Sequence, residues 1–316
     1  MPVDLTRYSP KPSKAKRFFD QREVLSDLGL SSADSLFSWL AAGARRSRAG
    51  ADASALAGSH VVYRGQPNAD YGLSPSLYRA CRAVKADVLE ADLAVAESAV
   101  IAAMRGEGVG RCMSDIELLQ VLQHHGIPTR LVDVSTGPLE ALFFAVDRND
   151  GADGRVFLIR LDAESEGDAL LDKPGRPLPW EGMAHGQTRA LDAWTQTLAL
   201  IEADPLDPRM RAQKGKFLVG GLNRRTVGRT MGNVPALDFA QVSSLGVNFI
   251  RQLRVGRNGC WPATGWTIRV PAEWKPHLRI RLASQPEPIT PDAMYPPLSE
   301  VRRLAMSCVR TALGHS

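Results

Sequence analysis

Apolar and polar positions form their most regular pattern in the middle of the chain, over residues 120–161. The helical period of the apolar residues predicts a helix at 116–123, with Ser114 or Asp115 as its N-cap. A β-branched and apolar run at 129–134 then predicts a buried strand. Glycine and proline residues lie between the two runs, as is typical of a helix end. The central unit therefore begins with a helix followed by a strand.

A polar turn of Ser135, Thr136 and Gly137 separates this strand from an almost wholly apolar run at 139–146. The run predicts a helix packed on most sides, and a second strand follows at 155–161. Hydroxyl groups and free backbone N–H groups at a helix N-terminus can bind an anion. We therefore expect an anion site at this turn, although Ser135 or Thr136 could instead only cap the helix.

The remaining segments predict an α+β protein with a twisted mixed sheet and flanking helices at both termini. The first 20 residues are predicted to be a loose arm. Helices are predicted at 31–49, 86–104, 188–203 and 296–313, strands at 60–65, 213–220, 265–270 and 274–282, and irregular loops at 173–180 and 221–242. The expected organisation is an N-terminal arm and helix at 1–58, a core at 59–283, and a C-terminal helix at 284–316 packed on the core.

Composition excludes several classes of protein. The chain has 316 residues, 44% of them hydrophobic, and no run reaches the length of a transmembrane helix. The polar and basic N-terminus lacks the apolar stretch of a signal peptide. The four cysteines are scattered without metal-binding spacing, which argues against structural zinc or disulfides and predicts a cytoplasmic location. The net charge of +5 comes from dispersed arginines, so nucleic-acid binding is not indicated on this ground.

Ionisable side chains gather around the predicted polar turn. His124 and His125 are adjacent, which suits a general base, but no third ligand has the spacing of a metal site, so we expect no metal. Asp133 could form a buried pair with Arg130, or either could face a ligand. Arg64, at the end of another predicted strand, could bind an anion or form a salt bridge to Asp133.

Three separated motifs stand out along the chain. They are Tyr63-Arg64-Gly65-Gln66 followed by LSPSLYR at 73–79, HHGIPTRLVD at 124–133 running into PLEALFFA at 138–145, and RAQKGKF at 211–217. Together they resemble the FRG domain, a bacterial family named after its aromatic-Arg-Gly motif. The resemblance covers about residues 60–220. Proteins of this family are suspected to be toxins or antiphage effectors.

A more distant resemblance is to ADP-ribosyltransferases of the Arg/Ser/Glu type. Those enzymes carry an aromatic-Arg pair on their first core strand, a Ser-Thr-Ser strand end before a helix, and a glutamate on a late strand. Arg64 with its preceding tyrosine, and Ser135 with Thr136, are similar to the first two features. The third has no clear counterpart, because Gly215 stands two residues after Gln213, where a glutamate is expected.

The resemblance implies an NAD-binding enzyme that transfers ADP-ribose to an unknown macromolecular acceptor. The implied nucleotide-binding residues are Arg64, Gly65, His124, Arg130, Ser135 and Thr136, and the implied catalytic residues are Gln213, His125 and Asp133. An arginine fork suits the pyrophosphate of NAD, and a carboxylate stabilises an oxocarbenium ion. Glu300 is an alternative to Asp133 for that carboxylate. The rival hypothesis is a non-catalytic module of a defence system that senses a nucleotide or a nucleic acid, which the missing glutamate favours.

Overall fold

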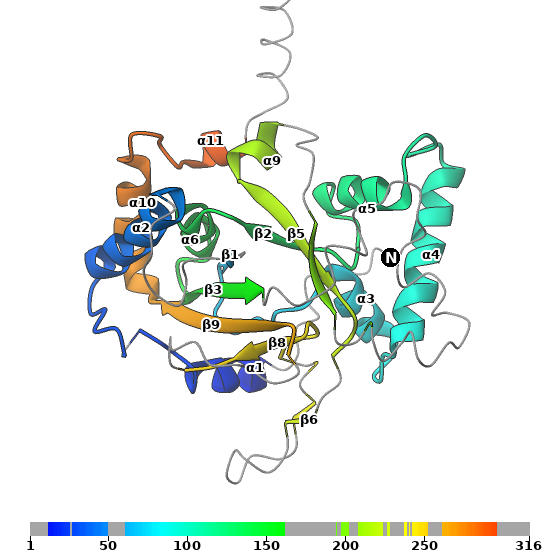
Figure 1. Ribbon diagram of the computed structural model, residues 1–316, viewed down its shortest axis with the longest axis horizontal. Coiled ribbons are helices and arrows are strands. Elements are labelled where there is room, and N and C mark those ends of the chain that lie inside the picture. Colours follow the sequence, from blue (N-terminus) through cyan, green and yellow to red (C-terminus); the bar gives the residue numbers. More distant parts are fainter. Residues whose placement is uncertain are drawn as a thin grey trace, which may run out of the picture.

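The computed structural model of the chain describes a large part of the 316 residues. The described residues are 12–25, 27–49, 61–161, 194, 197–201, 208–223, 226–227, 237–238, 240, 242–251 and 261–295. They form an α+β architecture around a curled mixed sheet of seven strands (Figure 1). The expected fold class is confirmed at this level.

The sheet has the strand order β4-β5-β2-β1-β3-β9-β8. Its strands are β1 (Val61–Gln66), β2 (Val132–Ser135), β3 (Gly154–Leu161), β4 (Leu198–Ile201), β5 (Gly215–Gly220), β8 (Val247–Phe249) and β9 (Ala263–Val270); β6 (Thr226–Val227) and β7 (Leu237–Asp238) form a separate pair. Only β8 and β9 pair in parallel among the described strands. β1 pairs with β3 along its full length, but with β2 only where Tyr63 lies opposite Ser135. The sheet is therefore weakly joined between β1 and β2.

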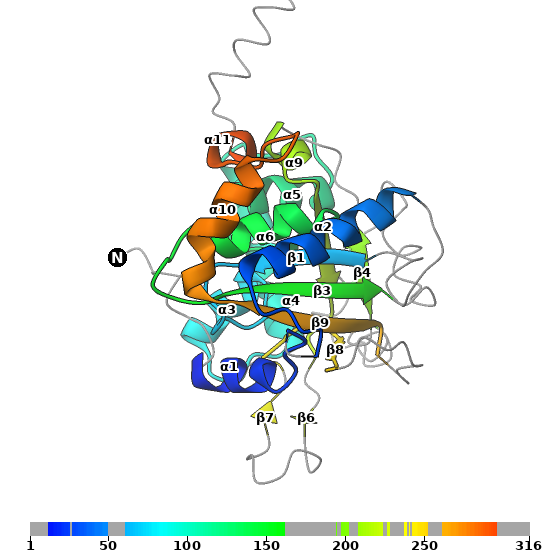
Figure 2. The ribbon, with the colours of Figure 1, turned by 90° about the vertical axis from the view of Figure 1, so that its left-hand side faces the viewer.

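Helices cover both faces and one end of the sheet. They are α1 (Pro12–Asp20), α2 (Ala33–Ala49), α3 (Ser76–Val84), α4 (Glu90–Gly106), α5 (Asp115–His124), α6 (Pro138–Val146), α9 (Pro208–Ala212), α10 (Lys275–Ala283) and α11 (Pro291–Met294), with a 3₁₀ turn, η4 (Ala272–Trp274). α2, α6 and α10 lie together on one face, whereas α1 lies below β8 and β9 (Figures 1 and 2). α3, α4 and α5 group beside β2 and β5 (Figure 1).

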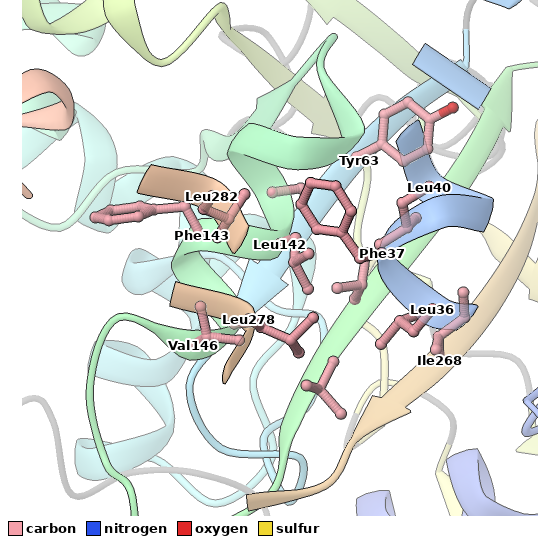
Figure 3. Close-up of a cluster of buried hydrophobic side chains, with 14 of the residues drawn as sticks. Leu36, Phe37, Leu40, Tyr63, Leu142, Phe143, Val146, Ile268, Leu278 and Leu282 are labelled. Atoms are coloured by element: carbon pink, nitrogen blue, oxygen red, sulfur yellow. The ribbon is translucent and has the colours of Figure 1, made fainter. Parts of the chain in front are cut away.

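The main hydrophobic core lies between the sheet and the three helices α2, α6 and α10 (Figure 3). Its centre contains Leu36, Phe37 and Leu40 of α2, Leu142, Phe143 and Val146 of α6, Leu278 and Leu282 of α10, and Tyr63 and Ile268 of the sheet. A second core fills the opposite face, where the ring of Phe19 lies 5.1 Å from the rings of both Phe157 and Phe249. These two cores account for the position of α1, α2, α6 and α10.

Helix α6 lies unusually close to the sheet. A Cβ atom on Gly65 of β1 would lie 1.8 Å from the carbonyl oxygen of Ala141 and 2.7 Å from the backbone nitrogen of Ala145. A Cβ atom on Gly154, at the start of β3, would lie 2.2 Å from the carbonyl oxygen of Ala145. Two glycines on the strands and two alanines on the helix therefore permit the backbones to approach this closely. The contact fixes the end of β1 relative to α6.

The structure confirms the central elements and corrects the predicted start of the strand at 129–134. α5 begins after its N-cap Ser114, and α6 and β3 lie where predicted. β2, however, begins only at Val132. The hydroxyl of Thr129 accepts a hydrogen bond from the N–H of Leu131, at 3.1 Å, and it also donates to the side chain of Gln123, at 2.6 Å. This local bonding holds residues 129–131 outside the strand.

Three other expectations about the elements are wrong in the described part of the chain. The end of the predicted arm is helix α1, because Phe18 and Phe19 are buried. The predicted strand at 274–282 is mainly α10. The end of the predicted helix at 188–203 is strand β4, paired with β5. Two short strands, β6 and β7, also fall within the predicted loop at 221–242.

Leu278, Ile280 and Leu282 alternate with arginines in the sequence, a pattern that is also typical of a strand. In fact Leu278 and Leu282 are buried one helical turn apart, while Ile280 is 64% exposed. The loop at 173–180, the helix at 296–313 and Glu300 lie outside the described residues, and the division at 58 and 283 stays a prediction. No helix in the described ranges combines the length and the apolar character needed to span a bilayer.

Candidate functional site

A cleft of about 660 Å³ lies beside the short pair between β1 and β2. Its volume falls in the range of small-molecule sites, which is roughly 300–1,000 Å³. The walls come from β1 and the loop after it, from α3, the end of α5, β2, α6, the turn between α9 and β5, and Tyr295 after α11. Elements from widely separated parts of the chain therefore meet at one concave surface.

The described lining of this cleft is basic and aromatic. Its cations are Arg64, Arg79, Arg148, Arg209 and Lys216, and its aromatic residues are Tyr63, Tyr71, Phe144, Phe217 and Tyr295. Among the described lining residues Asp133 is the one carboxylate. Such a lining favours an anionic ligand that also carries a ring.

Arg64 lies where β1 and β2 cease to pair. Its Nη1 donates to the carbonyl oxygen of Asp133, at 2.6 Å, and lies 3.8 Å from the Asp133 carboxylate. Its Nε is buried and has no hydrogen-bond partner among the described residues. Burial lowers the pKa of Arg64, and the negative charge of Asp133 acts against that lowering. The guanidinium thus replaces a strand ladder bond and keeps further donors for a ligand. The contact with Asp133, one of the two roles expected for Arg64, is therefore present.

The carboxylate of Asp133 is held by hydrogen bonds rather than by burial, since its side chain is 58% exposed. Gln123, at the end of α5, donates from Nε2 to Asp133 Oδ2 at 2.6 Å. The amide oxygen of Gln123 accepts from the hydroxyl of Thr129, which fixes the orientation of the amide. Asp133 therefore presents an oriented and accessible carboxylate to the cleft.

The hydroxyls of the predicted polar turn are largely engaged within the protein. Ser135 Oγ donates to the carbonyl of Gln213, at 2.8 Å, and accepts from the N–H of Gly137, at 3.0 Å. The hydroxyl and the N–H of Thr136 both donate to the carbonyl of Lys214, at 3.5 and 3.1 Å, and Thr136 is not among the lining residues. The side chain of Gln213 donates to the carbonyl of Met294, at 2.9 Å. Ser135 and Gln213 therefore line the cleft side by side, but they also clamp the turn before β5.

The N-terminus of α6 is not an open anion site. The buried carboxylate of Glu140 lies against Gly137, so closely that a Cβ atom on Gly137 would overlap with it. The same carboxylate pairs with the ammonium group of Lys214. A side chain of the protein thus occupies the position where a phosphate was expected, and the anion site predicted at this turn is wrong.

Arg130 does not reach the cleft. It is 1% exposed and forms ion pairs with Glu90 and Glu97 of α4. Glu90 also accepts from the indole N–H of Trp194, at 2.9 Å, and from the N–H of Leu222, at 2.7 Å. Two expectations about Arg130 are therefore wrong: it does not pair with Asp133, and it does not face a nucleotide in the cleft. Its guanidinium is bound instead by Glu90 and Glu97 in a buried ionic cluster.

The two histidines lie at the C-terminal end of α5 in different environments. His124 lines the cleft, whereas His125 is exposed and is not among the lining residues. Their rings meet edge to face at 5.6 Å. Adjacent residues of a helix cannot face one ligand, so only His124 is placed to contact one. In the described residues no group of three His, Cys, Asp or Glu side chains could hold a metal ion.

Sequence reasoning gave no role to several residues of the cleft. Arg79 lies in the first motif, where its spacing from Arg64 gave no sign of a contact. Arg209 lies 4.8 Å from the ring centre of Tyr295, and these residues are far apart in the sequence. The hydroxyl of Tyr295 donates to Asp147, at 3.3 Å. Arg209 and Tyr295 therefore form an aromatic and cationic part of the cleft lining, contributed by α9 and the residue after α11.

A buried lysine fixes the rim of the cleft. The ammonium group of Lys275 donates to the carbonyls of Pro67, Arg148 and Asn149, at 2.8, 3.0 and 2.9 Å. Burial lowers the pKa of Lys275. Pro67, Arg148 and Asn149 all line the cleft, so one side chain of α10 joins the two loops that form this rim.

Residues 59–154 match the family model of the FRG domain. The chain contains an FRG domain. The match begins two residues before β1 and ends at the first residue of β3, and so it includes Arg64, Arg79, Gln123 and Asp133. The FRG domain therefore supplies one side of the cleft, while Arg209, Gln213 and Tyr295 come from the following part of the chain. No curated protein and no solved structure matches the chain.

Proposed function

We propose that the cleft of this FRG-domain protein binds NAD or a closely related dinucleotide and transfers its ADP-ribose to a macromolecular acceptor. The observation that carries the proposal is the position of Arg64. Its desolvated guanidinium lies beside Asp133. Among the described residues that line this basic and aromatic cleft, Asp133 is the one that carries a carboxylate. Such an environment favours a ligand that carries phosphate groups and aromatic rings.

Binding would depend mainly on the cations and rings of the cleft. A guanidinium donates two parallel hydrogen bonds to a phosphate, which an ammonium group cannot reproduce. Arg64 is suited to this role, because only its Nη1 bonds to a described residue. The aromatic side chains of Phe144 and Tyr295 offer flat apolar surfaces for a base or a nicotinamide ring.

Transfer would use the carboxylate of Asp133. When the bond between nicotinamide and ribose breaks, nicotinamide leaves with the electron pair and positive charge develops on the ribose. The carboxylate of Asp133, which is oriented by its hydrogen bond from Gln123, would stabilise that charge. A nucleophile of the acceptor then bonds to the ribose carbon and loses its proton to water. Gln213 would position the ribose, and His124 would line the pocket.

A non-catalytic role is the second candidate. Among the described lining residues no carboxylate other than Asp133 is present, and Asp133 already accepts a hydrogen bond from Gln123. A cleft with many cations and one engaged carboxylate suits recognition of a nucleotide without chemistry. In either case we propose an effector or sensor of a defence system, which is the setting suspected for the family.

Two measurements separate these candidates. Titration calorimetry with NAD tests the site in the wild type and in Arg64→Lys. The control is Arg82→Lys, in the last turn of α3, because Arg82 is not among the residues that line the cleft. We expect about a tenfold or greater loss of affinity in Arg64→Lys, since a charge-assisted bond contributes roughly 1.5–3 kcal/mol. The control should bind as the wild type does. Absence of NAD binding by the wild type at millimolar concentration would refute the nucleotide proposal.

The second measurement follows nicotinamide release. We expect Asp133→Asn to abolish release while NAD still binds, and Gln213→Ala to slow release with little effect on affinity. Release from the wild type that Asp133→Asn leaves unchanged would show that Asp133 is not the catalytic carboxylate. Binding that depends on Arg64, without release by the wild type in the presence of a cell lysate, would support the non-catalytic candidate instead.

A further inference from the structure

Arg79 of α3 lies next to Arg64 in the cleft. Both side chains are among the lining residues. Burial lowers the pKa of Arg79 to about 10, and the positive charge of Arg64 contributes to this lowering. The two guanidinium groups therefore face the same enclosed space and repel each other, which is unfavourable unless an anion joins them.

The protein leaves most of the donors of both groups unused. Each guanidinium has five N–H donors. Arg64 donates to the carbonyl of Asp133, and Arg79 donates to the carbonyl of Ser74. Within the described residues Arg79 forms no ion pair, and the one pair of Arg64 is the 3.8 Å contact with Asp133. Two desolvated cations thus share at most one nearby carboxylate.

The two backbone carbonyls nevertheless fix both groups in place. Arg64 bonds to β2, and Arg79 bonds back to the segment that leads into α3. A second contact secures that segment, since Ser76 Oγ accepts from the N–H of Thr129, at 3.0 Å. The two guanidiniums are therefore held on separate elements of the FRG domain before any ligand arrives. Such preorganisation reduces the entropy that binding costs.

We propose that Arg64 and Arg79 form a subsite for two linked phosphate groups, so that the ligand of the cleft is a diphosphate compound. One guanidinium would bind each phosphate, and the linked anions would neutralise both cations at once. A single phosphate could accept a full pair of hydrogen bonds from only one of the two guanidinium groups. This inference rests on the proposed function and deepens it, because it assigns Arg79, together with Arg64, to the two linked phosphates of the ligand.

Inorganic pyrophosphate is the probe that tests the subsite without the rest of the nucleotide. Titration calorimetry compares pyrophosphate with inorganic phosphate on the full chain, in the wild type, Arg79→Lys and Arg79→Gln. Arg82→Gln is the matched control, since Arg82 lies one turn along α3 and is not among the lining residues. Thermal melting of each variant shows whether the loss of the bond to Ser74 disturbs the fold; Arg79→Lys keeps both the charge and a donor for that bond.

We expect pyrophosphate to bind the wild type at least about tenfold more tightly than phosphate. Arg79→Lys should weaken pyrophosphate about tenfold and Arg79→Gln about a hundredfold, while Arg82→Gln should match the wild type. Equal affinities for phosphate and pyrophosphate would overturn the inference. So would an Arg79→Lys protein that melts as the wild type does and binds pyrophosphate within about twofold of it.

The same variants distinguish failure of the subsite from failure of the proposed function. Binding of NAD that requires Arg64 but is unchanged in Arg79→Lys would remove the subsite and leave the nucleotide proposal intact. Binding of pyrophosphate that requires Arg79, in a protein that does not bind NAD, would retain the subsite and remove NAD as the ligand. A nucleoside diphosphate would then be titrated in its place.

Discussion

The close approach of α6 to β1 makes Gly65→Ala a sharp test of the fold around the site. The new Cβ atom would lie 1.8 Å from the carbonyl oxygen of Ala141 and 2.7 Å from the nitrogen of Ala145. Both atoms belong to the helix backbone, so no side-chain rotation can relieve the overlap. The strand and the helix would have to separate, and the main core of Figure 3 would be disturbed.

The magnitude follows from what is known of overpacked cores. An added methylene group in a well-packed core costs roughly 1–3 kcal/mol, and an overlap with rigid backbone belongs at or above the upper end. We therefore expect Gly65→Ala to reduce the free energy of unfolding by about 3 kcal/mol or more. At roughly 2–4 °C per kcal/mol, the melting temperature should fall by about 6–12 °C.

Gly43→Ala is the matched control, because the chemical change is identical and the surroundings differ. Gly43 lies within α2, and apart from its chain neighbours and the backbone of its own helix no described atom lies within 4 Å of the position of its added Cβ. Alanine favours a helix over glycine by about 1 kcal/mol, so this variant should melt at the same temperature or higher. Circular dichroism melts of both variants give the comparison. If Gly65→Ala melted within about a degree of the wild type, the close contact between β1 and α6 would be refuted.

Three further substitutions test the parts that support the cleft, each through its melting temperature. Phe143→Ala should cost about 3–5 kcal/mol, because the ring is 2% exposed in the main core, and an unchanged melt would show that α6 is not central. Arg130→Met should cost about 3–5 kcal/mol, because Glu90 and Glu97 would lose their buried counter-charge; a melt at or above that of the wild type would mean that the ionic cluster is dispensable. Lys275→Met should leave three rim carbonyls without their donor and cost about 1–3 kcal/mol, with weaker NAD binding, and unchanged binding would show that the rim does not shape the site.

The sequence pattern predicted the central unit well, because its signals are local. The N-cap Ser114, the polar turn and the apolar run of α6 each specify structure through neighbouring residues. The contact of Arg64 with Asp133 was one of the two roles that the sequence offered for Arg64. The α+β class followed from the same periodicities.

Other features depend on contacts between distant segments and could not be inferred from local pattern. The partners of Arg130 lie 33 and 40 residues earlier in the chain, so a pair with the nearby Asp133 was the simpler expectation. The side chain of Glu140 at the N-terminus of α6 depends on Lys214, which is also distant. In α10 the apolar residues Leu278, Ile280 and Leu282 alternate with arginines, a pattern that suits a strand as well as a helix. The apolar character of Leu278 alone could not show which of the two forms.

Amide hydrogen exchange with and without NAD tests the central claim most directly, because it reports both binding and its location. We predict that NAD slows exchange, in a saturable manner, in peptides that cover β1, α3 and β2, which contribute Arg64, Arg79 and Asp133 to the cleft. Peptides from α10 beyond Lys275 should be unaffected. No change at millimolar NAD, or protection confined to segments away from the cleft, would contradict the account.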